Sequence, residues 1–456
     1  LDGVHVELVG LIASSGANGS AEALLDLWQR RGTGVEANGC LALDPIGARA
    51  TDATTDVDAG IAHAVEMARR CAADHPRVRA IVVDSTRYAE AGGSDVEELG
   101  CSIATVVAYA RALVDAGMEP AEALAQVELR LAAGTDQFLT IAKLRAARLL
   151  WSRVVSHLGW SDVAPPPRQH AVMSGAVITH YDPWVNLLRG TIACMAAGVG
   201  GADSVTIEAY DSRHGPIPSA LGRRMARNTQ SILIEESRLS HVIDPAGGSY
   251  YVEWLTDAVA REAWDWFRAI ESAGGMVDAL ASGAVAERIG ATWEKRASAI
   301  ARRKDPITGV SEFPNIDEVV PAPTVDEVEP RTPEATELPR RRFASAFEDL
   351  RARSDEHLRR HGHRPVVLLA DLGAPADFTA RTTFAKNWFE AGGLATVAWE
   401  RDRTQLGDVL AALPGGAPAL ACLCSSDGVY VTDAGPALAE LRAAGVATVY
   451  LAGRHE

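Results

Sequence analysis

Long apolar runs are missing from this 456-residue sequence, and its basic residues are outnumbered by acidic ones. No stretch of about 18 consecutive apolar residues occurs, so the sequence predicts no helix that crosses a membrane. The 44 Lys and Arg residues stand against 60 Asp and Glu residues, which gives a formal net charge of −16. Nucleic acid and anionic lipid repel an acidic chain, so neither a nucleic acid nor a membrane is predicted as a partner.

Cysteine is also scarce, and its six positions are scattered: Cys40, Cys71, Cys101, Cys194, Cys422 and Cys424. No Cys-x-x-Cys pair combines with histidines, so no metal site is predicted. The sequence contains neither a P-loop nor a recognisable Ser/His/Asp triad. Scattered free thiols fit a reducing compartment, and the predicted location is the cytoplasm.

Six candidate strands alternate with helices in the first part of the chain, at about residues 4–12, 35–42, 78–84, 126–133, 170–177 and 203–209. This alternation predicts parallel βα units. Ser94 and Glu97 form a capping-box pattern before one helix, and Asp182-Pro183 places a cap residue before a proline at a first helical position. A closed (β/α)8 barrel needs eight strands, so these strands belong either to an open sheet or to a barrel with two further units before Leu1.

A proline-rich stretch divides the rest of the chain. Residues 1–312 are predicted to form the barrel-like domain with a helical extension. Residues 313–363 are predicted to be an extended linker and a connecting helix, because six prolines lie between residues 314 and 339. Residues 364–456 alternate four short strands with helices, one of which is predicted to begin at Pro436. This pattern predicts a flavodoxin-like doubly wound domain, which usually has a fifth strand and is therefore expected to be incomplete at its C-terminus.

Three motifs carry a resemblance to a known family. They are Asp-Pro-Trp-x-Asn-x-x-Arg from Asp182, Ala-Arg-Asn-Thr-Gln at residues 226–230, and Asp-Pro-Ala-Gly-Gly-Ser-Tyr-Tyr-Val-Glu at residues 244–253. In this order and at these spacings, they resemble the barrel domain of the methylmalonyl-CoA mutase family, whose members use adenosylcobalamin. The resemblance implies a TIM-type barrel whose first units are missing here, followed by a flavodoxin-like domain of the cobalamin-binding type.

The same resemblance implies that the catalytic groups of the barrel are lost. Active members carry Gly-Tyr-His-Met-Arg-Glu-Ala-Gly in one loop, and alignment on Glu-Ala-Gly puts Arg87 at the histidine position. An arginine is a permanent cation and cannot act as a neutral imidazole. A second loop, Asn-Ala-His-Asn in active members, has Ala132 and Gly134 here. Tyr181 stands at a glutamine position that approaches the substrate, and Ser212 stands at the position of a cofactor-facing glutamate.

The cobalamin loop of the family reads Asp-x-His-x-x-Gly, and its histidine is the lower cobalt ligand. The corresponding loop here begins at Asp371 and contains Gly373 and Asp377, but no histidine occurs between residues 364 and 454. Carboxylates and aliphatic side chains replace imidazole poorly as ligands of such a metal. The resemblance therefore implies that this chain binds no cofactor.

Within the family, the chain is most similar to the small (β), non-catalytic subunit type of the heterodimeric enzyme. This similarity implies a homologous large catalytic subunit as partner. The partner would bind adenosylcobalamin and interconvert (R)-methylmalonyl-CoA and succinyl-CoA, so that the complex is an isomerase. The linker is expected to wrap that partner, because it is too long and too rich in proline for a loop within a domain.

Two other functions remain open from the sequence. The chain could be a catalytic acyl-CoA mutase with a divergent substrate, in which Arg87 binds a carboxylate through two parallel hydrogen bonds. It could instead be an interaction protein for cofactor loading.

Two expectations concern packing. Tyr250 and Tyr251 follow a glycine-rich turn and are expected to fill a core. The helix after residue 135 carries four cations that are expected to be solvated, with a contact to a partner as the alternative: Lys143, Arg145, Arg148 and Arg153.

Overall fold

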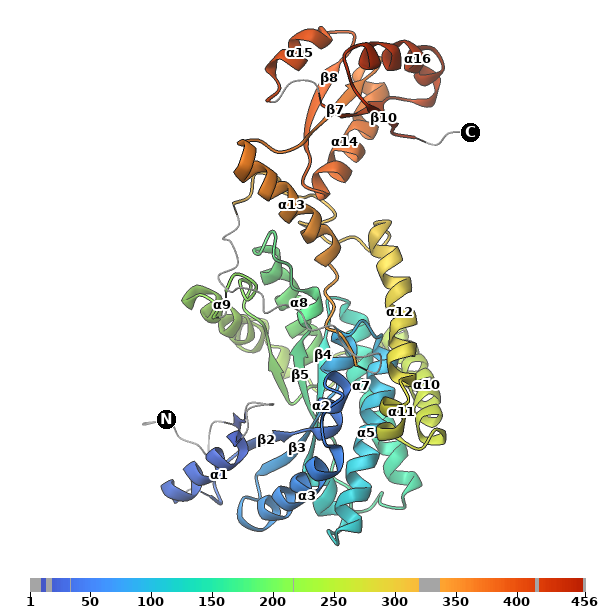
Figure 1. Ribbon diagram of the computed structural model, residues 1–456. Coiled ribbons are helices and arrows are strands. Elements are labelled where there is room, and N and C mark those ends of the chain that lie inside the picture. Colours follow the sequence, from blue (N-terminus) through green and yellow to red (C-terminus); the bar gives the residue numbers. More distant parts are fainter. Residues whose placement is uncertain are drawn as a thin grey trace. The chain divides into compact units, whose positions relative to one another are not determined.

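The computed structural model describes residues 10–13, 19–32, 34–215, 217–319, 337–414 and 418–453. The chain divides into two compact units. Unit 1 comprises Leu1–Ile178, Asn186–Arg296 and Thr324–Arg342, and unit 2 comprises Thr179–Val185, Ala297–Pro323 and Phe343–Glu456. Figure 1 gives the course of the chain. None of the described helices is long and apolar enough to cross a membrane.

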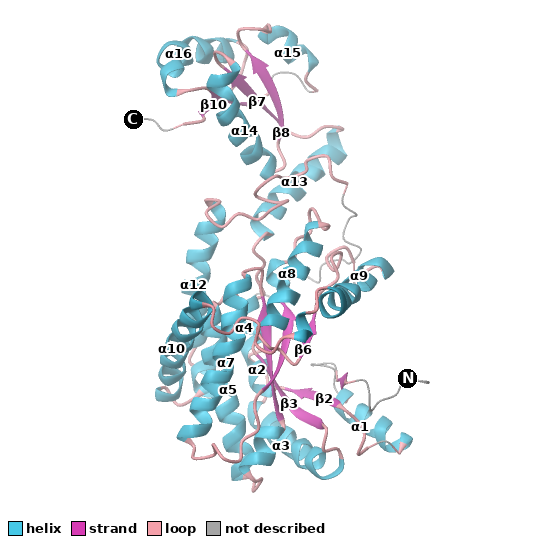
Figure 2. Ribbon diagram, turned by 180° about the vertical axis from the view of Figure 1, so that it is seen from behind, coloured by secondary structure: helices cyan, strands magenta, loops and turns pink. Residues whose placement is uncertain are grey.

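Unit 1 is built on a six-stranded parallel sheet (Figure 2). Its strands are β1 (Leu11–Ile12), β2 (Gly39–Leu43), β3 (Val78–Asp84), β4 (Val127–Ala133), β5 (Arg168–Met173) and β6 (Ser204–Thr206). They pair in the order of the sequence, β1-β2-β3-β4-β5-β6. A doubly wound sheet would reverse direction once, whereas a strictly sequential order is that of a TIM-type barrel. The predicted barrel class is therefore confirmed as a partial barrel.

The helices of unit 1 follow the strands in βα alternation. They are α1 (Ser20–Arg31), α2 (Pro45–Thr51), α3 (Val57–Asp74), α4 (Thr86–Glu90), α5 (Asp95–Asp115), α6 (Pro120–Ala125), α7 (Gln137–His157), α8 (Val185–Val199), α9 (Ala220–Ser231), α10 (Tyr250–Ser272) and α11 (Met276–Ala281). α12 (Ala284–Ala301) continues from unit 1 into unit 2. α10 packs against α5 so closely that a Cβ at Gly100 would lie 2.4 Å from the Trp266 ring.

The predicted helix starts are confirmed in one case and wrong in another. The Glu97 carboxylate accepts a hydrogen bond of 2.7 Å from the Ser94 backbone N–H, as the capping box predicts. α8, by contrast, begins at Val185 rather than at Pro183. Asp182 has a φ of 47°, and its backbone N–H is bound by the Glu318 carboxylate at 2.9 Å, so the chain turns there before the helix starts.

The two packing expectations are also wrong in part. Tyr250 is 95% exposed and Tyr251 is 52% exposed, so neither fills a core. Tyr251 instead contacts the rings of Phe138 and Trp254 at the surface, with ring centres 5.4 and 6.1 Å apart. Lys143, which was expected to be solvated, is fully buried.

Lys143 is buried because two carboxylates from α5 surround its ammonium group. Its Nζ atom lies 2.6 Å from Glu98 Oε2 and 2.8 Å from Asp95 Oδ1. The other oxygen of Glu98 accepts a hydrogen bond of 2.6 Å from the Ala132 backbone N–H at the end of β4. This one cluster therefore joins α5, α7 and β4.

Unit 2 contains a four-stranded parallel sheet. Its strands are β7 (Val366–Asp371), β8 (Ala395–Glu400), β9 (Leu420–Cys424) and β10 (Thr448–Leu451), in the order β10-β9-β7-β8. Its main helices are α13 (Ser345–His361), α14 (Pro375–Ala391), α15 (Leu406–Ala412) and α16 (Asp427–Ala443). This strand order is the flavodoxin-like one, so the predicted fold class is confirmed here as well.

Alternate residues of β7 divide between two apolar layers of unit 2. Val367 and Leu369 pack with Phe378 and Phe389 of α14, whereas Leu368 packs on the other face with residues of α16. The prediction that a helix begins at Pro436 is wrong, because α16 begins at Asp427 and the proline lies inside it.

Only the ends of the predicted linker, residues 313–319 and 337–342, lie among the described residues. The second end binds its own unit. Leu338 N–H donates to Ala50 O at 2.8 Å, and Arg341 N–H donates to Glu90 O at 2.8 Å. The Glu337 carboxylate accepts a hydrogen bond from Ala53 N–H at 2.8 Å. Residues 337–342 are therefore engaged by unit 1, and the expectation that the linker wraps a partner concerns residues outside the described ones.

The Lys143 cluster predicts a large stability effect. In Lys143→Met, Glu98 and Asp95 lose their counter-charge, and we expect the free energy of unfolding to fall by about 3–5 kcal/mol, measured by urea denaturation. Lys295→Met, which removes an exposed lysine from α12, is the matched control and should change stability by less than about 0.5 kcal/mol. Adding Glu98→Gln to Lys143→Met should recover part of the loss. Equal stability of Lys143→Met and the control would contradict this account.

Candidate active site

Arg87 lies in α4, directly after β3, where a barrel enzyme places catalytic groups. Its guanidinium group lies 4.0 Å from the Asp84 carboxylate. A second carboxylate, Asp44 at the end of β2, is buried. Burial raises the pKa of Asp44, and the positive charge of Arg87 opposes that rise. The charge of Arg87 is therefore already balanced within the chain.

Asp44 has a structural environment of its own. Its oxygens accept hydrogen bonds from the Gly47 N–H at 3.0 Å, from the Tyr109 hydroxyl at 2.8 Å and from the Asp84 N–H at 3.0 Å. These three hydrogen bonds satisfy the buried carboxylate of Asp44 and connect the ends of β2 and β3. Asp44 therefore has a structural role.

Ala132 and Gly134 lie at and just beyond the end of β4. The Ala132 N–H is bound by Glu98, and the Gly134 N–H donates to Thr140 Oγ1 at 3.2 Å. Burial raises the pKa of Glu98 to about 7, against the attraction of Lys143. Burial alone would lower the pKa of Lys143, but its two carboxylate neighbours together raise it. The polar groups at this strand end hold the fold together and do not point to a ligand.

One face of the sheet carries rows of charged side chains across neighbouring strands. Asp84 of β3 pairs in register with Arg130 of β4, which pairs with His170 of β5, and Glu128 pairs with Arg168. Residues in register on parallel strands share one face. Arg130 Nη1 lies 3.2 Å from Asp84 Oδ2, and Arg168 Nε lies 3.4 Å from Glu128 Oε2. Opposite charges on this face thus neutralise one another.

His170 completes this row as a neutral group. Its Nε2 atom lies 2.8 Å from Thr206 Oγ1 of β6. Burial, reinforced by the positive charge of Arg130, lowers the pKa of His170 to about 4. The charged residues on this sheet face were not singled out from the sequence. Glu128 and Arg130, polar residues at alternate positions of a predicted strand, were the signal that could have revealed them.

Tyr181 lies in a different compact unit from Arg87, Ala132, Gly134 and Ser212. It belongs to unit 2, where its hydroxyl donates to Asp355 Oδ2 of α13 at 2.6 Å. The Arg351 guanidinium lies over its ring, 4.4 Å from the ring centre. The neighbouring His180 N–H donates to Glu348 at 2.6 Å. Hydrogen bonds to Asp355 and Glu348 therefore fasten this loop to α13.

Ser212 follows β6, and its backbone N–H donates to Ala209 O at 3.0 Å. The adjacent Asp211 is buried, and its carboxylate accepts a hydrogen bond of 3.0 Å from the Ser219 N–H ahead of α9. A Cβ at Gly222 would lie 2.0 Å from this carboxylate. Asp211 therefore supports the start of α9, and Ser212 is part of the same turn.

Asp371, Gly373 and Asp377 surround the carboxyl end of β7 in unit 2. The Asp371 carboxylate is buried and accepts a hydrogen bond from the Thr382 hydroxyl. Burial raises its pKa to about 6, and that hydrogen bond opposes the rise. Asp377 binds the Ala374 N–H at 3.1 Å, which caps α14. Gly373 has a φ of 81°, a backbone conformation that residues with side chains rarely adopt.

The ends of β7 and β9 meet at the point where a flavodoxin-like sheet changes direction and usually binds its ligand. Here, Arg381 spans this point. It donates to Ser425 O at 2.7 Å and to Asp427 Oδ1 at 2.5 Å. Ser425 Oγ in turn donates to Leu372 O at 2.7 Å. The loops at this crevice are tied to each other by their own side chains.

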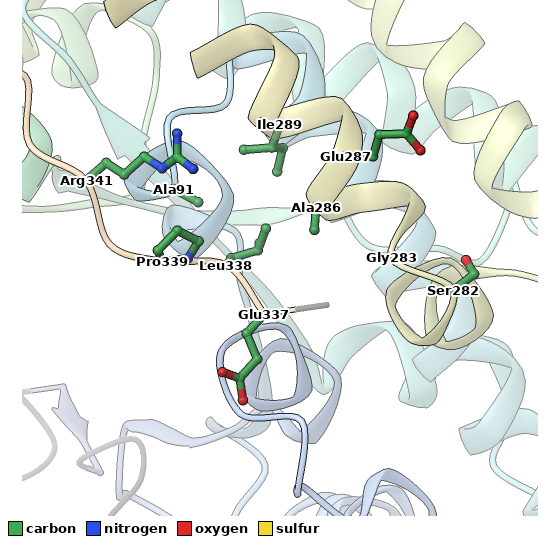
Figure 3. A pocket seen from close by; sticks show the side chains of 11 residues that line it. Ala91, Ser282, Gly283, Ala286, Glu287, Ile289, Glu337, Leu338, Pro339 and Arg341 are labelled. Carbon is green, nitrogen blue, oxygen red and sulfur yellow. The ribbon is translucent and has the colours of Figure 1, made fainter. Parts of the chain in front are cut away.

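Unit 1 also has a groove of about 460 Å³, part of which is lined by Ala91 just after α4 (Figure 3). It runs between α12 and residues 337–341, with Leu338 and Ile289 as its apolar wall and Arg341 at one end. None of the residues predicted from the sequence lines it.

Comparison with known proteins places these features in a family. A family model described as methylmalonyl-CoA mutase matches residues 29–358. The methylmalonyl-CoA mutase small subunit of Streptomyces virginiae is 49% identical over 461 residues, which cover 100% of this chain and 73% of that protein. The small subunit of Propionibacterium freudenreichii subsp. shermanii is 36% identical over 436 residues, covering 95% and 66%. The methylmalonyl-CoA mutase of Escherichia coli (strain K12) is 35% identical over 244 residues, covering 53% and 34%.

The buried His170 predicts a loss of stability in acid. Its pKa in the folded chain is about 4, below the ordinary value of 6.5, so between these values the unfolded chain binds a proton that the folded chain does not. Lowering the pH from about 7 to about 4.5 should therefore cost the wild-type chain about 2–3 kcal/mol more than His170→Gln.

Urea denaturation at each pH measures this difference. Glu128, Asp84, Arg130 and Arg168 face the imidazole, and both proteins contain them. Their own titration therefore largely cancels in the comparison. Parallel loss of stability in the two proteins would show that His170 is not held neutral.

Proposed function

Because the chain belongs to the methylmalonyl-CoA mutase family, an adenosylcobalamin-dependent family of isomerases, we propose that it is the small, non-catalytic subunit of such an enzyme. It would support a homologous large subunit that interconverts (R)-methylmalonyl-CoA and succinyl-CoA. The relatives that match it along most of its length are named small subunits. We further propose a cytoplasmic location and a division into a barrel domain (1–312), a linker with a connecting helix (313–363) and a cobalamin-domain-like domain (364–456).

The observation that carries this proposal is that polar groups at the would-be active positions bind each other. Arg87 is balanced by Asp84 and Asp44, and Tyr181 is bound to Asp355. A substrate would have to break such contacts inside a low-dielectric environment before it could use these groups. This reasoning disfavours the alternative in which Arg87 binds a substrate carboxylate.

The residues of unit 2 do not fit cobalamin. A lower cobalt ligand would have to come from the loop after β7, in which the third residue from Asp371 is Gly373 rather than histidine. The φ of 81° at Gly373 disfavours any side chain there, and Arg381 joins Ser425 and Asp427 across the crevice. We therefore assign no cofactor to this chain and place adenosylcobalamin in the partner subunit.

In this role, the chain contributes structure rather than a chemical step. The paired charges on the sheet face of unit 1 and the internally bonded loops of unit 2 stabilise each unit by itself for contact with a partner of similar fold. In a symmetric dimer, both subunits use the same surface patch. A large subunit of similar fold is therefore expected to pack against this chain in a pseudo-symmetric way.

Cobalamin retention by separated subunits tests the proposal. We expect the purified chain to come out of a desalting column colourless after incubation with adenosylcobalamin, whereas the co-purified large subunit keeps the visible absorbance of the cofactor. We also expect the chain alone to give no turnover of methylmalonyl-CoA. Stoichiometric absorbance on this chain, or turnover without a partner, would contradict the non-catalytic assignment. Failure to co-purify with any mutase subunit would instead favour a separate role in cofactor loading.

A further inference from the structure

Three histidines gather at the end of α13 in unit 2: His357, His361 and His363. Their ring centres are 4.3 Å apart for His357 and His361, 5.4 Å apart for His357 and His363, and 6.4 Å apart for His361 and His363. Neither the catalytic positions nor the cobalamin-type loop includes any of them. The cluster is therefore a feature that the proposed function leaves unused.

The local backbone explains why the three rings meet. His357 and His361 are four residues apart, so they lie on one face of α13. Gly362 then ends the helix with a φ of 77°, and its N–H donates to Leu358 O at 2.8 Å. This left-handed cap reverses the chain, and the reversal returns His363 to the face that carries the other two.

The nitrogens of this cluster are suited to a metal ion. His363 Nδ1 lies 3.0 Å from the Arg364 carbonyl oxygen, and a proton on Nδ1 would leave Nε2 with a free electron pair. Bonding of the second imidazole nitrogen to a carbonyl is the usual support for a metal-binding histidine. The two carboxylates that precede His357 in the sequence are engaged elsewhere: Asp355 pairs with Arg364 at 2.5 Å, and Glu356 pairs with Arg359 and Arg360.

We propose that His357, His361 and His363 bind one divalent transition-metal ion of the zinc type. Imidazole is a favoured ligand for zinc, cobalt, nickel and copper. Three imidazoles that share an ion at about 2.0–2.1 Å have ring centres about 5 Å apart, which the observed spacing brackets. Three protein ligands leave a fourth position for water or for another ligand.

The rings of His357 and His361 must turn before they can bind an ion together with His363. As they stand, no group of three or more His, Cys, Asp or Glu side chains among the described residues converges as a ready metal site. His361 is exposed and His357 is half-buried, so neither ring is enclosed by a core. The bound ion would then join the last turn of α13 to the segment that enters β7.

Cobalt binding to the metal-free, tag-free chain tests this site. After removal of metals with a chelator, we expect one equivalent of Co²⁺ to give a saturable visible absorbance, which Zn²⁺ then displaces. His357→Gln and His361→Gln should each weaken Co²⁺ binding about tenfold or more, because each removes one of three bonds to the ion. His241→Gln, which changes an exposed histidine of unit 1, should leave the affinity unchanged.

Far-UV circular dichroism of each variant checks that the fold is kept, and we expect it to be kept because neither His357 nor His361 is buried in a core. Two results would overturn the proposal: equal affinity in all variants, or weak binding that never saturates at one equivalent. Either would mean that the ion associates with the surface adventitiously. The readout needs neither cobalamin nor a partner, so its failure would be separate from a failure of the proposed function.

Discussion

The buried cluster of Lys143, Glu98 and Asp95 is the interaction on which the carboxyl end of the sheet in unit 1 depends. An ammonium group with almost no contact with water is tolerable only when charged partners replace that water. Asp95 and Glu98 do so at 2.8 and 2.6 Å, and Glu98 also holds the Ala132 backbone. The position of β4 is thereby coupled to two helices at the very edge where a barrel enzyme would display catalytic groups.

The same logic extends along the neighbouring strands. Parallel pairing in register puts Asp84, Arg130 and His170 in one row, and Glu128 and Arg168 in another. Each charge has an opposite charge on the next strand, and the imidazole is kept neutral by burial. In an enzyme, charged groups at such positions bind the substrate, whereas here the groups stabilise each other. The physical cost of freeing them is one reason that we propose a supporting role for this chain.

Unit 2 shows a related arrangement on a different sheet. Its strand order creates a direction change between β7 and β9, a place where flavodoxin-like domains bind ligands. Arg381, Ser425 and Asp427 connect the two loops there, and the buried Asp371 is satisfied by Thr382. The apolar layers on the two faces of the sheet consist mainly of strand and helix residues. Polar side chains in the loops can therefore change without loss of the sheet.

The sequence by itself determined the fold class and most element positions, because the spacing of apolar residues and the cap residues act over a few neighbours. It located β3, β4 and the Ser94 capping box closely. Only the tertiary structure decided the surroundings of single side chains. Tyr181 meets Asp355 across 174 positions of sequence, Lys143 is buried by carboxylates 45 and 48 positions earlier, and Tyr250 is left exposed. Such outcomes depend on which distant surfaces pack together, and local patterns contain no information about that.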